Sequence, residues 1–121
     1  MARNILVVED DPSFSEIMVD VLSSAGYEVT ATASGFGVAG LVRRLNPCAV
    51  LLDLGLPYRP GSSVLADLKA DPSTAKVPVL ILSGMTEALS AERRALANAV
   101  IEKPVDLDTL LDLIGNVATA A

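Results

Sequence analysis

Acidic side chains follow directly after two separate apolar runs in this sequence. Glu9 and Asp10 come after the run 5–8, and Asp53 comes after the run 49–52. Short, wholly apolar runs of this kind are typical of strands buried on both faces of a parallel sheet. Ligands of open α/β sheets bind outside the carboxyl ends of the strands. We therefore expect these three carboxylates to meet at one sheet edge and to act chemically there.

Carboxylates that lie close together repel one another, so such a cluster must raise a pKa or hold a cation. Oxygen ligands without nitrogen or sulfur favour Mg²⁺ or Mn²⁺. Two further polar residues follow later apolar runs: Ser83 supplies a hydroxyl after 77–82, and Lys103 an ammonium shortly after 99–101. A carboxylate nucleophile, a metal, a hydroxyl and a lysine together are suited to phosphoryl transfer.

Each of these residues also has an ordinary structural interpretation. An acidic pair after a strand is commonly a helix N-cap, a serine there is commonly a turn hydroxyl, and a single lysine is commonly a surface group. Their joint occurrence at the ends of four expected strands favours one shared site, because chance would scatter them.

The elements that must position these residues alternate regularly along the chain. We expect strands at 5–8, 28–32, 49–52, 77–82 and 99–101. The segments between them place apolar residues at helical spacing, most weakly between the fourth and fifth strands. Such alternation predicts parallel strands joined by right-handed crossovers, with helices on both faces.

The expected fold is α/β: a flavodoxin-like, doubly wound, five-stranded parallel sheet in the order 2-1-3-4-5. Strands one and three are neighbours in this order. Glu9, Asp10 and Asp53 therefore converge at the carboxyl edge of the sheet.

Length and composition limit the class of protein further. A chain of 121 residues is expected to form one domain, 1–121, around a single core. The net charge of −6 argues against direct nucleic-acid binding through a basic face. Histidine is absent, which excludes Ser-His triads and His-ligated zinc. A phosphoryl group carried on histidine must therefore come from another molecule.

The sequence predicts a cytoplasmic location without membrane association. No apolar run approaches the roughly 20 residues that a membrane span needs, and the start does not resemble a signal peptide. The single cysteine, Cys48, cannot form an internal disulfide, which fits a reducing compartment. Because little sequence follows the last helical pattern, we expect either a stand-alone domain or a piece of a longer protein.

Taken in order, these motifs resemble the receiver domains of two-component response regulators over essentially the whole chain. The resemblance rests on the acidic opening 5–11, the phosphoacceptor segment 51–57 with Gly61, the hydroxyl-bearing strand 79–84 and the pair Lys103-Pro104. It implies that Asp53 would attack the phosphorus of a kinase phosphohistidine and become an aspartyl phosphate.

The resemblance also assigns the metal ligands. Asp10 and Asp53, with the Gly55 carbonyl, would bind Mg²⁺, and Glu9 would act directly or through water.

The same resemblance implies roles for the remaining site residues. Lys103 would pair with the phosphoryl oxygens, Ser83 would swing in to hydrogen-bond one of them, and the Lys103-Pro104 bond should be cis. Receiver domains usually carry Tyr or Phe three residues before the lysine, where this chain has Val100. We therefore expect signalling through the order of the segment 87–98 rather than through an aromatic rotamer switch.

A receiver domain would be a phosphoacceptor that catalyses its own phosphorylation and dephosphorylation, not an enzyme with a separate substrate. Its expected partners are a sensor histidine kinase or histidine phosphotransfer protein and a downstream protein effector. One alternative is a receiver-like interaction domain that works without phosphorylation. Another is an aspartate-nucleophile phosphatase of the haloacid dehalogenase type. Such phosphatases usually carry a second acid two residues after the nucleophile, where this chain has Gly55.

Overall fold

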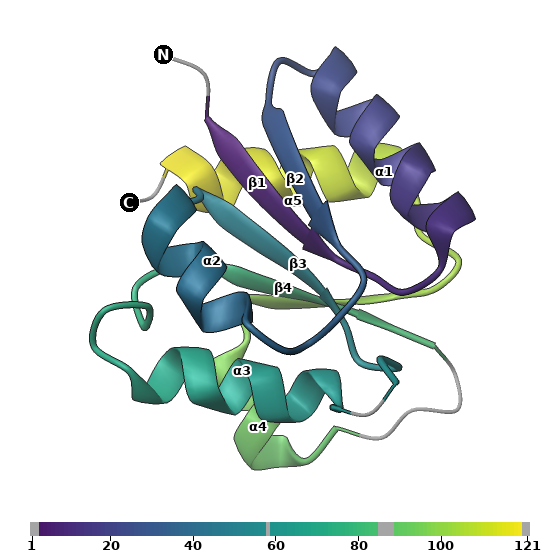
Figure 1. The fold of residues 1–121 in the computed structure, drawn as a ribbon. Helices are drawn as coiled ribbons and strands as arrows, with labels where there is room; N and C mark the ends of the chain where they lie inside the picture. The colour runs from purple at the N-terminus through teal and green to yellow at the C-terminus, as the bar shows by residue number, and fades with distance from the viewer. Residues whose placement is uncertain (1–2, 58, 85–88, 120–121) are drawn as a thin grey trace.

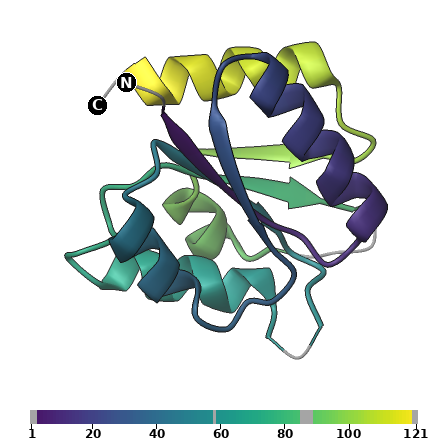
Figure 2. The same ribbon diagram turned by 45° about the horizontal axis from the view of Figure 1, so that its top comes forward.

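The computed structural model describes residues 3–57, 59–84 and 89–119. Within them, five strands form one parallel sheet in the order β2-β1-β3-β4-β5, with helices on both faces (Figures 1 and 2). In chain order the elements are β1 (Asn4–Val8), α1 (Pro12–Ser24), β2 (Glu28–Thr32), α2 (Val38–Leu45), β3 (Ala49–Asp53), α3 (Gly61–Ala70), β4 (Val79–Ser83), α4 (Ala91–Leu96), β5 (Ala99–Glu102) and α5 (Leu107–Thr119). The predicted flavodoxin-like order is confirmed. None of the helices in these ranges is long and apolar enough to cross a bilayer.

The sheet separates two apolar layers, one with α1 and α5 and the other with α2 and α3 (Figure 2). The first cluster comprises Ile5, Val7, Met18, Leu22, Leu51, Leu80, Leu82, Ile101, Leu110 and Ile114. The second comprises Leu6, Val8, Val38, Val42, Val50, Leu52, Leu54, Leu56, Val64, Leu65, Leu68, Val79 and Ile81. Successive residues of β1 and β3 alternate between the two clusters, which is why these strands read as continuous apolar runs.

Register sets the position of the acidic residues. β1 pairs with β3 so that Val8 lies opposite Leu52. The next residues along each strand, Glu9 and Asp53, therefore reach the same edge of the sheet.

Helix α1 begins and ends on clear sequence signals. Asp11 is its N-cap, and the Asp11 carboxylate accepts from the Ser13 amide at 3.0 Å and from the Phe14 amide at 3.5 Å. Pro12 occupies the first turn, where its missing N–H costs nothing. After the helix, Gly26 adopts φ 98°, the left-handed conformation that a Schellman-type end requires.

Two local features differ from what residue types alone suggest. Serine is a common N-cap and Ser62 and Ser63 lie in the first turn of α3, but the N-cap is Pro60 and no side chain caps this helix. The fourth strand begins at Val79 rather than at Val77. Pro78 has no N–H to donate to a sheet ladder, and the Val77 amide instead bonds the Thr74 carbonyl at 3.1 Å.

Helix α4 is short, as the sequence indicated, and none of its residues is buried. Arg93 connects α4 to α3, because its Nη1 donates to the Ser62 carbonyl at 2.6 Å. Residues 85–88 lie outside the described residues, and signal relay through the order of the segment 87–98 stays a prediction.

Lys69 holds the segment between α3 and β4 to the start of β5. Its Nζ donates to the carbonyls of Ala75 (3.1 Å) and Val77 (2.8 Å) and to Asn98 Oδ1 (3.3 Å), and burial lowers its pKa. Replacing Lys69 by Met should remove the donor from the Ala75 and Val77 carbonyls and lower the free energy of unfolding by about 1–3 kcal/mol. Urea denaturation of Lys69→Met beside the exposed control Lys76→Met measures this, and equal midpoints would contradict it.

Candidate functional site

Three carboxylates meet at the carboxyl edge of β1 and β3. Glu9 and Asp10 follow β1, Asp53 ends β3, and each offers an oxygen within 4.8 Å of the others. Glu9 and Asp53 are only 2% and 3% exposed, whereas Asp10 is exposed. The cluster is therefore buried on the sheet side and accessible to solvent through Asp10.

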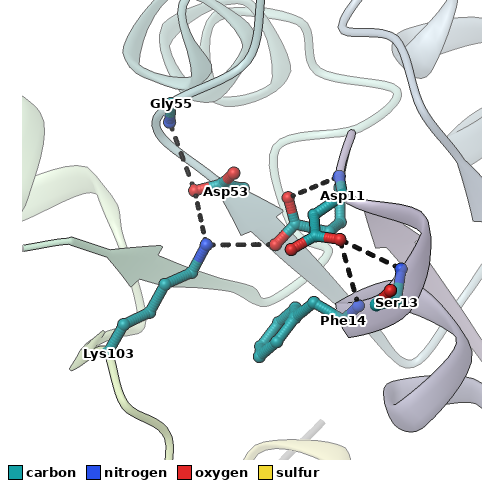
Figure 3. A network of polar contacts seen from close by, with 7 residues as sticks. Asp11, Ser13, Phe14, Asp53, Gly55 and Lys103 are labelled. Atoms are coloured by element: carbon teal, nitrogen blue, oxygen red, sulfur yellow. Dashed lines mark hydrogen bonds and ion pairs between the residues drawn. The ribbon is translucent and has the colours of Figure 1, made fainter.

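Lys103, which directly follows the edge strand β5, brings a positive charge to this cluster. Its Nζ lies 3.1 Å from Glu9 Oε1 and 3.3 Å from Asp53 Oδ1 (Figure 3). The Lys103 amide donates to the Ser83 carbonyl at 2.8 Å, so β4 fixes the point at which β5 ends. The Lys103-Pro104 bond is cis, as the resemblance implied.

Burial and charge set the protonation of Glu9 and Lys103. Burial, together with a hydrogen bond to Asp53 and the charge of that residue, raises the pKa of Glu9 to about 7 against the opposing effect of Lys103. Burial lowers the pKa of Lys103, but the hydrogen bond to Glu9 and the charge of Asp53 outweigh burial and raise it overall. Lys103 is therefore a stable cation, and a further cation would favour ionised Glu9.

Backbone amides orient the two buried carboxylates. The Gly55 amide donates to Asp53 Oδ1 at 3.2 Å, and the Asp11 amide donates to Glu9 Oε2 at 3.3 Å (Figure 3). Hydrogen bonds of this kind restrict the side-chain rotamers without adding charge. Gly55 was predicted to contribute its carbonyl, and its observed contact is made by its amide.

Ser83 lies at the same sheet edge but is turned to its own backbone. It is the last residue of β4, and its hydroxyl donates to the Gly84 carbonyl at 3.1 Å. A hydroxyl has one proton to donate, so in this conformation Ser83 does not donate to Asp53. The structure thus brings together four of the predicted site residues, namely Glu9, Asp10, Asp53 and Lys103. The Ser83 hydroxyl lies at the same sheet edge and would have to rotate away from the Gly84 carbonyl to donate to the site.

Two residues make contacts at the site that the sequence patterns did not predict. The Phe14 ring lies 4.9 Å from Lys103 Nζ, although its spacing marked it as an apolar residue of α1. Gly61 packs so tightly that a Cβ there would lie 2.8 Å from the Leu54 Cα and closer still to the Asp53 carbonyl oxygen. Spacing along the chain carries no signal for either contact, because each depends on a distant segment.

A cavity of about 430 Å³ opens beside the acidic cluster. It lies between α1 and the end of β2, and Glu9, Asp10, Ser15 and Thr32 contribute to its lining. The acidic cluster is therefore reachable from the α1 side.

Comparison with known proteins agrees with this geometry. The family model described as "Response regulator receiver domain" matches residues 5–115. The DNA-binding dual master transcriptional regulator RpaA of Synechocystis is 32% identical over 109 residues, which are 88% of this chain and 45% of RpaA. The DNA-binding response regulator MtrA of Mycolicibacterium smegmatis is 38% identical over 89 residues, which are 74% of this chain and 38% of MtrA. The chain thus spans less than half the length of these relatives.

A solved structure is similar over nearly the full length. The receiver domain of the sensor histidine kinase PA1611 from Pseudomonas aeruginosa is 28% identical with a TM-score of 0.85, and the match covers 98% of this chain and 99% of that one. That structure holds a magnesium ion coordinated in its active site cleft. The family-model match, the strand order and the acidic cluster beside Lys103 agree, and the chain belongs to the response regulator receiver domain family.

Proposed function

We propose that this receiver domain accepts a phosphoryl group on Asp53. The observation that carries the proposal is the position of the Asp53 carboxylate, which lies within 4.8 Å of two other carboxylates and 3.3 Å from the ammonium of Lys103. A nucleophile, hard oxygen ligands and a cation for the phosphoryl oxygens are thereby present in one place.

The donor set fits a divalent metal. Glu9, Asp10 and Asp53 offer hard carboxylate oxygens at mutual distances that one ion can span, and the Gly55 carbonyl is the proposed further ligand. Such a set suits Mg²⁺ and also accepts Mn²⁺. When bound, the metal would offset the charge of the carboxylates and polarise the phosphoryl oxygens.

The residues of the chain then have distinct tasks. An Asp53 oxygen attacks the phosphorus of a phosphohistidine, the bond from phosphorus to the imidazole nitrogen breaks, and that nitrogen keeps the electron pair. Lys103 transfers hydrogen bonds from the carboxylates to the phosphoryl oxygens. Ser83 rotates away from the Gly84 carbonyl to donate to the same group.

Incubation with acetyl phosphate and Mg²⁺ tests the proposal. We expect intact-mass spectrometry to show one phosphoryl adduct, which fails to form when EDTA removes the metal. Steady hydrolysis of the donor without an adduct would instead indicate an aspartate-nucleophile phosphatase. No adduct and no hydrolysis would indicate an interaction domain that works without phosphorylation.

The proposed partners follow from composition and family. The chain has no histidine, so the phosphoryl group comes from a sensor histidine kinase or a histidine phosphotransfer protein. The output passes to a downstream protein effector. A net charge of −6 supports the absence of direct nucleic-acid binding by this domain. The proposed domain works in the cytoplasm and turns over no separate substrate.

Replacing Asp10 by Asn should weaken Mg²⁺ binding by at least about tenfold, because it removes a charged ligand from a site built on few of them. Because the chain lacks tryptophan, amide chemical shifts in an NMR titration are a suitable readout. The matched control is Asp20→Asn, which makes the same change at an exposed residue of α1 outside the acidic cluster. Equal Mg²⁺ affinity of the two variants would contradict the ligand assignment.

A further inference from the structure

Phe14 lies against the ammonium of Lys103. We propose that Phe14 is a positioning residue for phosphoryl transfer, whose ring holds Lys103 beside Asp53, an inference that rests on the function proposed above. The Lys103 Nζ lies 4.9 Å from the centre of the ring, within the roughly 6 Å at which an aromatic face attracts a cation. Figure 3 shows the ring projecting from the first turn of α1 toward the Lys103 side chain.

Lys103 needs such support because its ammonium must reach far from its backbone. It follows β5, whereas Asp53 ends β3, and β4 lies between these two strands. Two strand spacings amount to roughly 10 Å. The Lys103 side chain therefore has to extend toward Asp53, whose own side chain covers the rest of the distance. A four-carbon stem has many rotamers, so holding it extended is entropically unfavourable.

The ring supplies a kind of attraction that the carboxylates do not. Glu9 accepts a directed hydrogen bond from the ammonium and Asp53 forms an ion pair with it, and the hydrogen bond to Glu9 must turn when Lys103 bonds a phosphoryl group. An aromatic face attracts the charge itself and binds none of its N–H groups in a fixed direction. Phe14 can therefore keep the ammonium in place while its N–H groups turn from Glu9 to the phosphoryl oxygens.

Phe14 is itself well fixed. Its amide donates to the Asp11 carboxylate that caps α1, and its side chain is partly buried against the cluster that includes Ile5 and Leu110. The Asp11 amide also donates to Glu9. Asp11 thus helps to fix the positions of both the buried Glu9 carboxylate and the Phe14 ring that faces Lys103.

Two substitutions separate positioning from simple packing. Phe14→Leu keeps an apolar side chain but removes the ring, whereas Phe14→Tyr keeps the ring. In a time course of phosphorylation by acetyl phosphate and Mg²⁺, we expect the rate constant of Phe14→Leu to fall roughly 3- to 10-fold. Phe14→Tyr should restore most of the rate. The matched control Phe36→Leu, which changes an exposed phenylalanine between β2 and α2, should leave the rate unchanged.

Two further readouts report on Lys103 itself. Its ε-methylene NMR signals should carry a ring-current shift that is lost in Phe14→Leu and kept in Phe14→Tyr. In a Lys103→Met background, Phe14→Leu should cause no additional loss of rate. A ring that only packs would slow phosphorylation equally with or without the lysine.

The outcomes distinguish this inference from the proposed function. If the wild type forms an adduct and Phe14→Leu forms it at the same rate, the positioning role is overturned and the phosphoacceptor role stands. Unmoved ε-methylene signals, or an equal loss in the Lys103→Met background, also overturn it. A wild type that forms no adduct overturns the proposed function, and the role of Phe14 in phosphoryl transfer with it.

Discussion

Asp53→Asn is expected to abolish formation of the phosphoryl adduct. The amide of asparagine is not a nucleophile toward phosphorus, and the change also removes one of the three carboxylates of the cluster. The fold should persist, because asparagine has nearly the shape of aspartate and its oxygen can still accept the bond from the Gly55 amide. Intact-mass spectrometry after acetyl phosphate and Mg²⁺ measures the loss, with circular dichroism as the check of folding.

The matched control is Asp112→Asn, which makes the same chemical change at an exposed position of α5. It should form the adduct at the wild-type rate. An adduct of undiminished yield in Asp53→Asn would show that another residue accepts the phosphoryl group.

Gly61→Ala is expected to destabilise the domain by about 1–3 kcal/mol, the range for overpacking a tight site. The added Cβ would lie 2.8 Å from the Leu54 Cα and closer still to the Asp53 carbonyl oxygen, and both are backbone atoms that cannot rotate away. Relief requires α3 or the end of β3 to move, so phosphorylation of Asp53 should slow as well. The midpoint of urea denaturation measures the first effect and the adduct time course the second.

Gly40→Ala is the control for this substitution. Gly40 lies within α2 and a Cβ there would meet nothing within 4 Å. Alanine should therefore stabilise the helix by up to about 1 kcal/mol. Equal denaturation midpoints for Gly61→Ala and the wild type would contradict the tight packing of Gly61 against the end of β3.

Much of this fold follows from patterns that act over a few residues. Apolar runs at Ile5–Val8 and Ala49–Leu52 predict buried parallel strands, and the rule for strand ends then predicts that Glu9, Asp10 and Asp53 meet. No distant contact has to be known for this step. The strand order and the convergence of these carboxylates were accordingly predictable from the sequence.

Other details depend on groups that only the folded chain brings together. Gly61 packs against the backbone of Asp53 and Leu54 at the start of α3, and neither Ser62 nor Ser63 caps this helix. The closeness of Phe14 and Lys103 requires the ends of α1 and β5 to be in place. The hydroxyl rotamer of Ser83 is a local choice between two acceptors, which residue type alone does not decide.

The most direct test of the phosphoacceptor site is to locate the phosphoryl group on the chain. Borohydride reduction after treatment with acetyl phosphate and Mg²⁺ converts an aspartyl phosphate to homoserine, which tandem mass spectrometry can place at one position. The arrangement of the carboxylates around Lys103 predicts homoserine at position 53. Reduction at Glu9 or Asp10 with Asp53 intact would contradict it.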